Sequence, residues 1–401
     1  MLMDSLGISK LDLKRQNRMQ ILRLLRNNGP ISRIDIAHTI HITKAAVTII
    51  TNEMIREGIL IEIGEQAPTG KVSRGRKKIL LDIHSTWRLV LGISLHGGWV
   101  DVGLCTLNGS IVEHHTAPLQ PDDPPEQLIG AIRSIYGDLA YKNDLKQDSL
   151  IGVGVAVDPA YFPICGIERG RNGQTVFTGL EKKLCTCFSF PAAFGELAEA
   201  ISVAESDFCP GSQSAQHQVV LQMGGSFGSC VTIGQESYRG ANGRACRFEN
   251  LPLGETRSTV RNTLSKQAVA RQLDDLHTRQ LSPSLDSQSA NDRQKAEWIF
   301  CRSGFSPEDP AVCRYFDEIR TDYTSVFQTV LTMFDPETVI VQPDESVLEA
   351  LSQAIGNINA RLGREAIRLS RFDETNLFLT GAALAVRECF TNRGGTMPET
   401  E

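Results

Sequence analysis

Basic side chains gather in one short stretch of the chain, between residues 71 and 78. Ammonium and guanidinium groups bind phosphates, and an arginine also fits the minor groove of DNA. The stretch contains Lys71, Arg74, Arg76, Lys77 and Lys78. Ser32 and Arg33 stand at the start of a predicted helix, where backbone N–H groups and the helix dipole favour a phosphate. Both features predict contacts with the phosphate backbone of a nucleic acid.

A second group of residues has the sizes and the donors that are needed to read base edges. The apolar spacing predicts a helix over Lys44–Glu57, capped by Thr43 and ended by Gly58. Its outer side carries short or flexible polar groups and an alanine that admits close approach to a thymine methyl. These residues are Thr43, Lys44, Ala45 and Thr48, with Thr51 and Asn52 one turn later. They predict a recognition helix that lies in the major groove.

The elements around these residues follow the order of a winged helix-turn-helix. The apolar spacing predicts helices over Asn17–Asn28 and Arg33–Ile40 before the recognition helix, and strands over Ile59–Ile63 and Arg76–Ile83 after it. Three helices followed by a hairpin with a basic tip predict a domain over residues 1–83 that binds double-stranded DNA. The alternative is a three-helix interaction module whose basic loop is only solvated.

The distribution of charge supports the first interpretation. Residues 1–83 carry 14 Lys and Arg against 8 Asp and Glu, although the whole chain has a net charge of −6. The remaining residues carry 27 Lys and Arg against 39 Asp and Glu. A basic N-terminal domain on an acidic body indicates that this domain alone meets a polyanion.

The rest of the chain is predicted to form an α/β body. With 401 residues, the chain is long enough for two or three domains. Beyond Arg88, strand patterns such as Leu150–Val157 alternate with helical patterns such as Glu126–Tyr141 and Asp317–Met333. The 10 cysteines lie at irregular spacings, which does not indicate a disulfide framework. No secretory leader or membrane span is predicted, so we expect a cytoplasmic protein without membrane contact.

Five segments of the chain resemble the ROK family, named for repressors, open reading frames and kinases. They are NRMQILRLLRNNGPISRIDIAHTIHITKAAVTIITNEMIREGIL, GRKKILLDI, LGISLHGGWVDVGLCTLNGSIV, SYRGANGRA and TGAALAV. The resemblance implies two actin-like (ribonuclease-H-like) lobes with a cleft between them. The first lobe would span residues 84–195, completed by a C-terminal helix at about 376–392. The second would span residues 196–375 and contain the effector cleft and the dimer contacts.

The sequence departs from the family's kinase motifs at each chemical position. Ser94 stands where the kinases have the acidic residue that manages Mg-bound phosphates, and Leu197 stands where they have the catalytic base. Arg247 replaces the sugar-binding Glu, and Asn250 replaces the zinc-ligating His. No cysteine lies between Cys246 and Cys301, so the family's structural zinc lacks its ligands. We therefore expect no catalysis, no metal and no cofactor.

Two interpretations of the cleft stay open. If the alignment slips by one residue, Glu196 takes the position of the base, and the chain would be a sugar kinase with a DNA-binding head. Otherwise Glu196, Arg247 and Asn250 are the candidate effector residues, because they occupy the family's ligand positions. Arg247 then favours a sugar phosphate or an acid sugar over a plain sugar, unless it pairs with an acidic neighbour in a cleft that has lost its ligand.

The sequence as a whole predicts a transcriptional regulator, most simply a repressor of carbohydrate-related genes. A homodimer or homotetramer would present its heads to the two halves of a pseudo-palindromic operator. A regulator that has no small-molecule effector is the further alternative.

Overall fold

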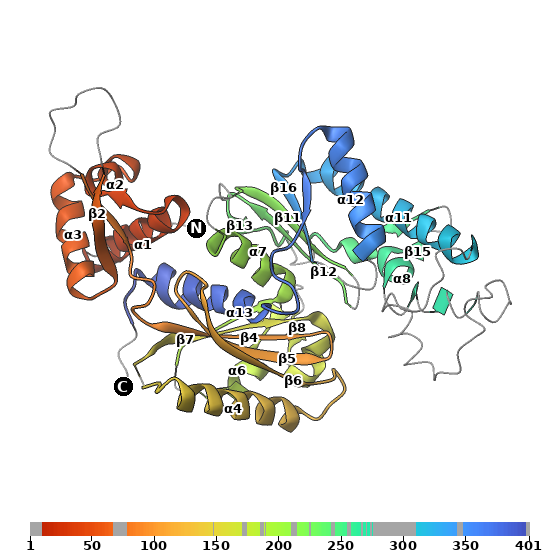
Figure 1. The fold of residues 1–401 in the computed structure, drawn as a ribbon, viewed down its shortest axis with the longest axis horizontal. Coiled ribbons are helices and arrows are strands. Elements are labelled where there is room, and N and C mark those ends of the chain that lie inside the picture. Colours follow the sequence, from red (N-terminus) through yellow and green to blue (C-terminus); the bar gives the residue numbers. More distant parts are fainter. Residues whose placement is uncertain are drawn as a thin grey trace, which may run out of the picture.

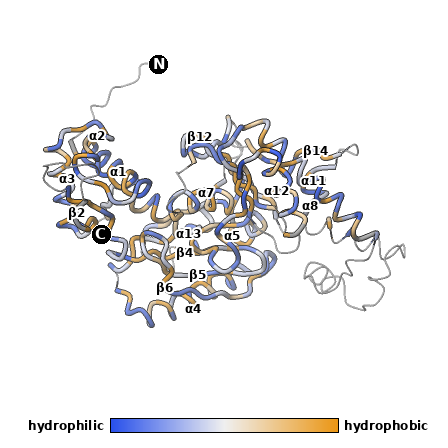
Figure 2. Tube along the Cα trace, turned by 45° about the horizontal axis from the view of Figure 1, so that its top comes forward, coloured by the Kyte–Doolittle hydropathy of each residue, from blue (hydrophilic) through white to orange (hydrophobic). Residues whose placement is uncertain are grey.

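Three helices and a three-stranded sheet form the N-terminal domain, hereafter the head (Figure 1). The computed structural model describes residues 10–66, 78–146, 148–170, 175–184, 188, 190–209, 215–223, 226–241, 245–254, 258–265, 268–269, 271–272, 275, 310–342 and 348–397. The head consists of α1 (Lys10–Asn28), β1 (Ile31–Ser32), α2 (Arg33–Thr39), α3 (Lys44–Arg56), β2 (Leu60–Gln66) and β3 (Lys78–Ile83). In Figure 2 both hydrophobic and hydrophilic residues occur along each of its helices, because only one face of each helix is buried.

The helix starts in the head are set by the predicted caps. The hydroxyl of Ser32 accepts a hydrogen bond from the Asp35 amide at 3.3 Å, and that of Thr43 accepts one from the Ala46 amide at 3.2 Å. Gly58 follows α3 with a φ of 80°, a conformation that a glycine adopts without strain. The short strand β1 was not predicted, since two residues carry no periodic signal and form a strand only by pairing with β3.

The first lobe is built on a mixed sheet with the strand order β10-β7-β4-β5-β6. Its strands are β4 (Leu89–His96), β5 (Trp99–Thr106), β6 (Ile111–Pro118), β7 (Leu150–Val157) and β10 (Ala192–Glu196). The first three strands are antiparallel, and β7 and β10 continue the sheet in parallel. The helix α4 (Pro125–Lys142) packs on β5 and β6. The smaller elements of this lobe are η1 (Pro159–Tyr161), α5 (Phe162–Cys165), β8 (Glu168–Arg169), β9 (Thr175–Val176) and α6 (Thr178–Leu184).

The second lobe repeats this plan with the order β13-β12-β11-β16-β17. Again three antiparallel strands are followed by two parallel ones. The strands are β11 (His217–Gln222), β12 (Gly228–Ile233), β13 (Glu236–Ser237), β16 (Thr338–Gln342) and β17 (Ile367–Leu369). The helices are α7 (Leu197–Asp207), α8 (Val260–Leu264), α11 (Pro310–Phe334) and α12 (Leu348–Leu362), with η2 (Phe248–Asn250) and the pair β14 (Pro252–Leu253) and β15 (Ser258–Thr259) beside them. The predicted helix over Asp317–Met333 lies within α11.

The C-terminal segment returns to the first lobe. The helix α13 (Phe378–Ala385) is buried along its whole length and contacts β4, β7 and α7. It continues into a π-helical turn, η4 (Val386–Phe390), and a 3-10 turn, η5 (Thr391–Arg393). The C-terminal helix expected at about residues 376–392 begins at Phe378, where the buried Asp101 carboxylate accepts a hydrogen bond from the Phe378 amide. The division of the chain at residues 83, 195 and 375 is our proposal for its domains.

A search of the described helices finds none that is long and apolar enough to cross a membrane. The buried apolar residues form clusters inside the first lobe, inside the second lobe, and along a continuous path from the head through α7 to α13. This path means that the head and the body share one hydrophobic core.

The approach of α13 to the first sheet is set by glycine. A Cβ atom on Gly381 would lie 2.5 Å from the Gly154 carbonyl oxygen and closer still to that of Ile93. We expect Gly381→Ala to destabilise the protein by about 1–3 kcal/mol, because the added methyl group forces helix and sheet apart. Urea denaturation followed by circular dichroism measures this.

The matched control is Gly137→Ala in α4, where a Cβ atom meets no neighbour within 4 Å. There alanine stabilises a helix by about 0.5–1 kcal/mol relative to glycine. Equal effects of the two substitutions would contradict the close packing.

Candidate nucleic-acid interface and effector pocket

The outer face of α3 is exposed as predicted for Lys44, Ala45, Thr48 and Asn52. Thr43 is also exposed, although its hydroxyl is used by the helix cap. Sequence reasoning missed Ile49, whose side chain is 62% exposed in the middle of this face. Its position was the available signal, since residues 45, 48, 49 and 52 share one side of a helix.

Thr51 and Ser32 do not belong to the exposed surface, which corrects two of the predicted positions. Thr51 is fully buried, and its hydroxyl donates to the Val47 carbonyl at 2.8 Å. It lies four residues after Val47 and therefore on the apolar face of the helix. Ser32 is 2% exposed, and its hydroxyl donates to the Asp35 carboxylate at 2.6 Å while it caps α2. Neither side chain is open to a DNA molecule.

Arg33 forms a bridge between α2, α3 and β2. Its Nε donates to the Thr51 hydroxyl at 3.1 Å, and its Nη2 donates to Asn52 Oδ1 at 3.1 Å and to Glu62 Oε1 at 2.9 Å. Because Asn52 Oδ1 accepts from Arg33, the amide nitrogen of Asn52 is the donor that this side chain offers on the exposed face of α3. Arg33 thus holds the side chain of Asn52 in place on α3, and the phosphate contact expected of Arg33 stays a prediction.

The hairpin of β2 and β3, hereafter the wing, is joined to α2 by an ion pair at Lys78, the first residue of β3. Lys78 Nζ lies 2.9 Å from Asp35 Oδ1, and hydrogen bonds from Ser32 and Lys78 lower the pKa of Asp35. The positive charge of Lys78 is therefore paired with the Asp35 carboxylate inside the head. The other predicted wing residues, Lys71, Arg74, Arg76 and Lys77, lie outside the described residues.

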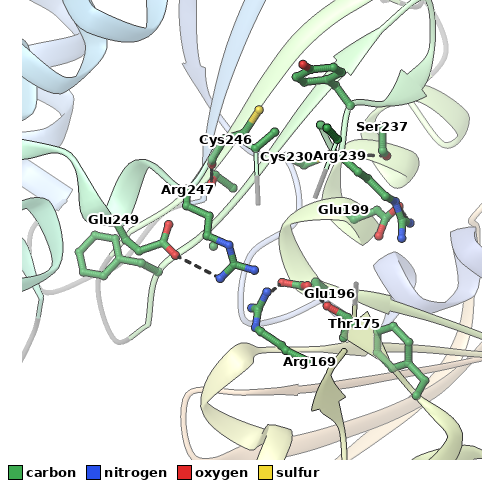
Figure 3. Close-up of a pocket in the computed structure, with 18 residues that line it drawn as sticks. Arg169, Thr175, Glu196, Glu199, Cys230, Ser237, Arg239, Cys246, Arg247 and Glu249 are labelled. Carbon is green, nitrogen blue, oxygen red and sulfur yellow. Dashed lines mark hydrogen bonds and ion pairs between the residues drawn. The ribbon is translucent and has the colours of Figure 1, made fainter. Parts of the chain in front are cut away.

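A cavity of about 390 Å³ lies between the lobes and is lined by charged side chains from both (Figure 3). β8 and β10 of the first lobe contribute Arg169 and Glu196, and the first turn of α7 contributes Glu199. The second lobe contributes Arg239, Arg247 and Glu249. Figure 3 shows the guanidinium groups of Arg169 and Arg247 pointing into the same space.

Glu196 is held by two residues of the first lobe. Arg169 Nη2 donates to Glu196 Oε2 at 3.3 Å, and the Thr175 hydroxyl donates to Oε1. The neighbouring Leu197, which takes the position of the kinase base, is 1% exposed. Both carboxylate oxygens of Glu196 are thus engaged by the chain itself, which weakens the interpretation of Glu196 as a base.

Arg247 faces the cavity as predicted, and Asn250 does not. Asn250 is exposed at the end of η2, outside the residues that line the cavity. The neighbouring Glu249 lines the cavity instead. Its Oε1 lies 3.8 Å from Arg247 Nη1 and 3.7 Å from Arg261 Nη2. Burial raises the pKa of Glu249, and the nearby Arg261 and Arg169 oppose this shift. In the sequence, the acidic residue two positions after Arg247 was the sign that Arg247 and Glu249 could pair.

A buried serine stands at the position where the resemblance places the acidic residue of the kinases. Ser94 is fully buried, and its hydroxyl has no hydrogen-bond partner among the described residues. Nearby, the lobes are joined through Asp158, which accepts hydrogen bonds from Gln222 Nε2 at 2.6 Å and from the Ser226 hydroxyl. Within the described part of the chain, no group of three His, Cys, Asp or Glu residues is arranged to hold a metal ion.

Comparisons with known proteins agree with this arrangement. Residues 14–61 match the family described as winged helix-turn-helix DNA-binding. The chain is 23% identical over 241 residues to the xylose repressor of Caldicellulosiruptor bescii, covering 58% of this chain and 57% of that protein. It is 26% identical over 253 residues to the N-acetylglucosamine repressor of Escherichia coli O6:H1, covering 62% of this chain and 61% of that protein. The chain thus spans about three fifths of the length of these curated relatives.

A solved structure, described as a ROK family transcriptional regulator and homolog of the E. coli MLC protein, is similar over almost the whole chain. It is 18% identical, has a TM-score of 0.68, and the match covers 96% of this chain and 97% of that chain. This likeness confirms the predicted fold, a winged helix-turn-helix head on a two-lobed ROK body, and the relatives confirm the resemblance to ROK repressors.

Proposed function

We propose that this chain is a DNA-binding transcriptional repressor of carbohydrate-related genes, with a non-catalytic body that holds an effector pocket and forms a homodimer or homotetramer. The observation that carries the proposal is the exposed face of α3 on a head whose core is continuous with a kinase-like body. The names of the two relatives support the link to sugars. The proposal places the protein in the cytoplasm, where its DNA is.

In the proposed complex, α3 lies in the major groove of each half of a pseudo-palindromic operator. Lys44, Ala45, Thr48 and Asn52 contact base edges, and the exposed Ile49 is suited to a thymine methyl. The wing residues Lys71, Arg74, Arg76 and Lys77 contact phosphates or the minor groove.

For the effector, the pocket supports a small polar molecule such as a sugar. Each of its three arginines has a glutamate within 4 Å, so positive and negative charges are balanced. This balance favours a neutral sugar, whose hydroxyl groups both donate and accept hydrogen bonds. A sugar phosphate or an acid sugar is the competing class, since Arg247 is paired only at 3.8 Å.

The second candidate function is a sugar kinase with a DNA-binding head. The observation that favours it is the kinase-like fold of the body. It would require Glu196 to act as a base, although Arg169 and Thr175 occupy its oxygens. ATP-dependent phosphorylation of a hexose by the purified protein would establish this function and contradict the non-catalytic body.

Base-reading and phosphate-binding residues should respond differently to substitution. We expect Lys44→Ala and Thr48→Ala to change the preferred DNA sequence, with losses of about 1–3 kcal/mol per base contact. We expect Arg74→Ala and Arg76→Ala to weaken binding to all sequences and to reduce the salt slope by about one. Selection of duplexes from a random pool, followed by fluorescence anisotropy at several salt concentrations, measures both. Unchanged binding in all four variants would refute the docking.

Arg33 should act through Asn52. We expect Arg33→Ala and Asn52→Ala to relax preference at the same base position, and Arg33→Ala to leave the salt slope unchanged because its guanidinium serves the protein. The same anisotropy series measures this. A slope that falls by about one in Arg33→Ala would instead identify a phosphate contact.

The pocket should be tested with xylose, N-acetylglucosamine and their phosphates in a thermal-shift assay. A molecule that binds the folded state raises the melting temperature. We expect Arg247→Met to remove the shift, and Asn250→Ala to retain it, because Asn250 lies outside the cavity. If no member of the panel shifts the wild-type protein, the alternative without a sugar effector is favoured.

A further inference from the structure

The helix α7 connects the pocket with the head. Its N-terminal end lies in the cavity, where Glu196 precedes the helix and Glu199 in its first turn accepts from Arg239 Nη2 at 2.7 Å. Eleven residues further, the helix ends at Asp207, about 16 Å away. Along this length all residues from Leu197 to Glu205 except Glu199 are buried. A helix packed on all sides moves as a rigid unit.

At its far end α7 meets the head through one ion pair. Asp207 Oδ2 lies 3.6 Å from Nη1 of Arg26, a residue of α1, and both side chains are less than a tenth exposed. Asp207 also accepts two hydrogen bonds from Arg387, at 2.6 and 3.1 Å. Direct packing between α1 and α7 accompanies the pair.

Arg26 is poorly satisfied at this position. None of its three guanidinium nitrogens has a hydrogen-bond partner among the described residues, and burial lowers its pKa. A buried cation without hydrogen bonds keeps a large part of its desolvation cost, so its energy depends strongly on the position of the nearest carboxylate. The contact is therefore sensitive to small displacements of Asp207.

The head and α7 both contact the C-terminal segment, where α7 binds Arg387, but only α7 also has hydrogen bonds to the second sheet among those described. The head is held to the C-terminal segment, since Arg18 Nε donates to the Gly394 carbonyl at 2.7 Å and Arg23 donates to Asn392 Oδ1 at 2.9 Å. In contrast, α7 is bonded to the second lobe, where Gln218 Nε2 donates to Ser202 Oγ at 2.7 Å and Glu205 accepts from Arg368 at 2.8 Å. The Arg26–Asp207 pair thus joins the head to a helix that is hydrogen-bonded to strands of the second lobe.

We propose that α7 transmits the state of the pocket to the DNA-binding head through the contact between Asp207 and Arg26. This inference rests on the proposed function, because it supplies the route by which an effector would change operator binding. A ligand that engages Glu196 or Glu199 alters the bonds of the first turn, and the helix carries the displacement to Asp207. The docking of α1 changes in response, and with it the placement of the head.

The experiment replaces the ligand by a substitution at the pocket end and reads the head in the full-length protein. Glu199→Gln weakens the ion pair with Arg239, and hydrogen–deuterium exchange of peptides from α1 reports the docking of the head. We expect at least about a twofold change in the exchange rate of α1 peptides. In the background of Arg26→Met this change should disappear, because the head no longer senses Asp207, which keeps its bonds to Arg387.

The matched control is Arg23→Met, which lies one turn earlier on α1 and contacts the C-terminal segment instead of α7. The effect of Glu199→Gln should persist in this background. If circular dichroism shows that Arg26→Met is not folded, Asp207→Asn tests the same contact from the side of the body. The proposal is overturned if Glu199→Gln leaves α1 unchanged, or if its effect survives in Arg26→Met or Asp207→Asn.

The readout uses neither DNA nor a sugar. Failure of the proposed function would appear as missing operator binding in the anisotropy series, whereas failure of the α7 link appears only in the exchange data.

Discussion

The close contact between α13 and the first sheet is the constraint on which the architecture depends. At Gly92, Gly154 and Gly381 a side chain would meet backbone atoms of the opposite element. This approach buries α13 completely, and the turn η5 that follows it lies beside α1. The position of the head therefore depends on the packing of a helix that begins 295 residues after the head ends, from Ile83 to Phe378.

The charged groups that line the cavity between the lobes are mostly engaged in contacts within the protein itself. In the cavity Glu196 pairs with Arg169, Glu199 with Arg239 and Glu249 with Arg247. Such pairs can exchange partners with the hydroxyl groups of a ligand at moderate cost, because each is at least partly exposed to water on one side. We regard this exchange as suited to sensing, which requires reversible binding without chemistry.

Local patterns predicted much of the head and of the sheets. The caps at Ser32 and Thr43 and the strand Leu150–Val157 depend on neighbouring residues, and the structure has them as expected. Thr51 was misplaced because its polarity outweighed its helical position, and Asn250 was misplaced because a motif position does not fix a side-chain direction. The contacts of Arg33 with Asn52 and of Arg26 with Asp207 join residues 19 and 181 positions apart. No periodic signal in the sequence reports such pairs.

The contact of Arg18 with Gly394 has a consequence for the order of assembly. During synthesis the head emerges well before its docking partners, Asn392 and Gly394, because a chain grows from its N-terminal side. The head is therefore synthesised before the residues that fix its position on the body. A chain that stalls or is cut before residue 391 would contain the residues of the head but would lack the contacts with Asn392 and Gly394 that orient it.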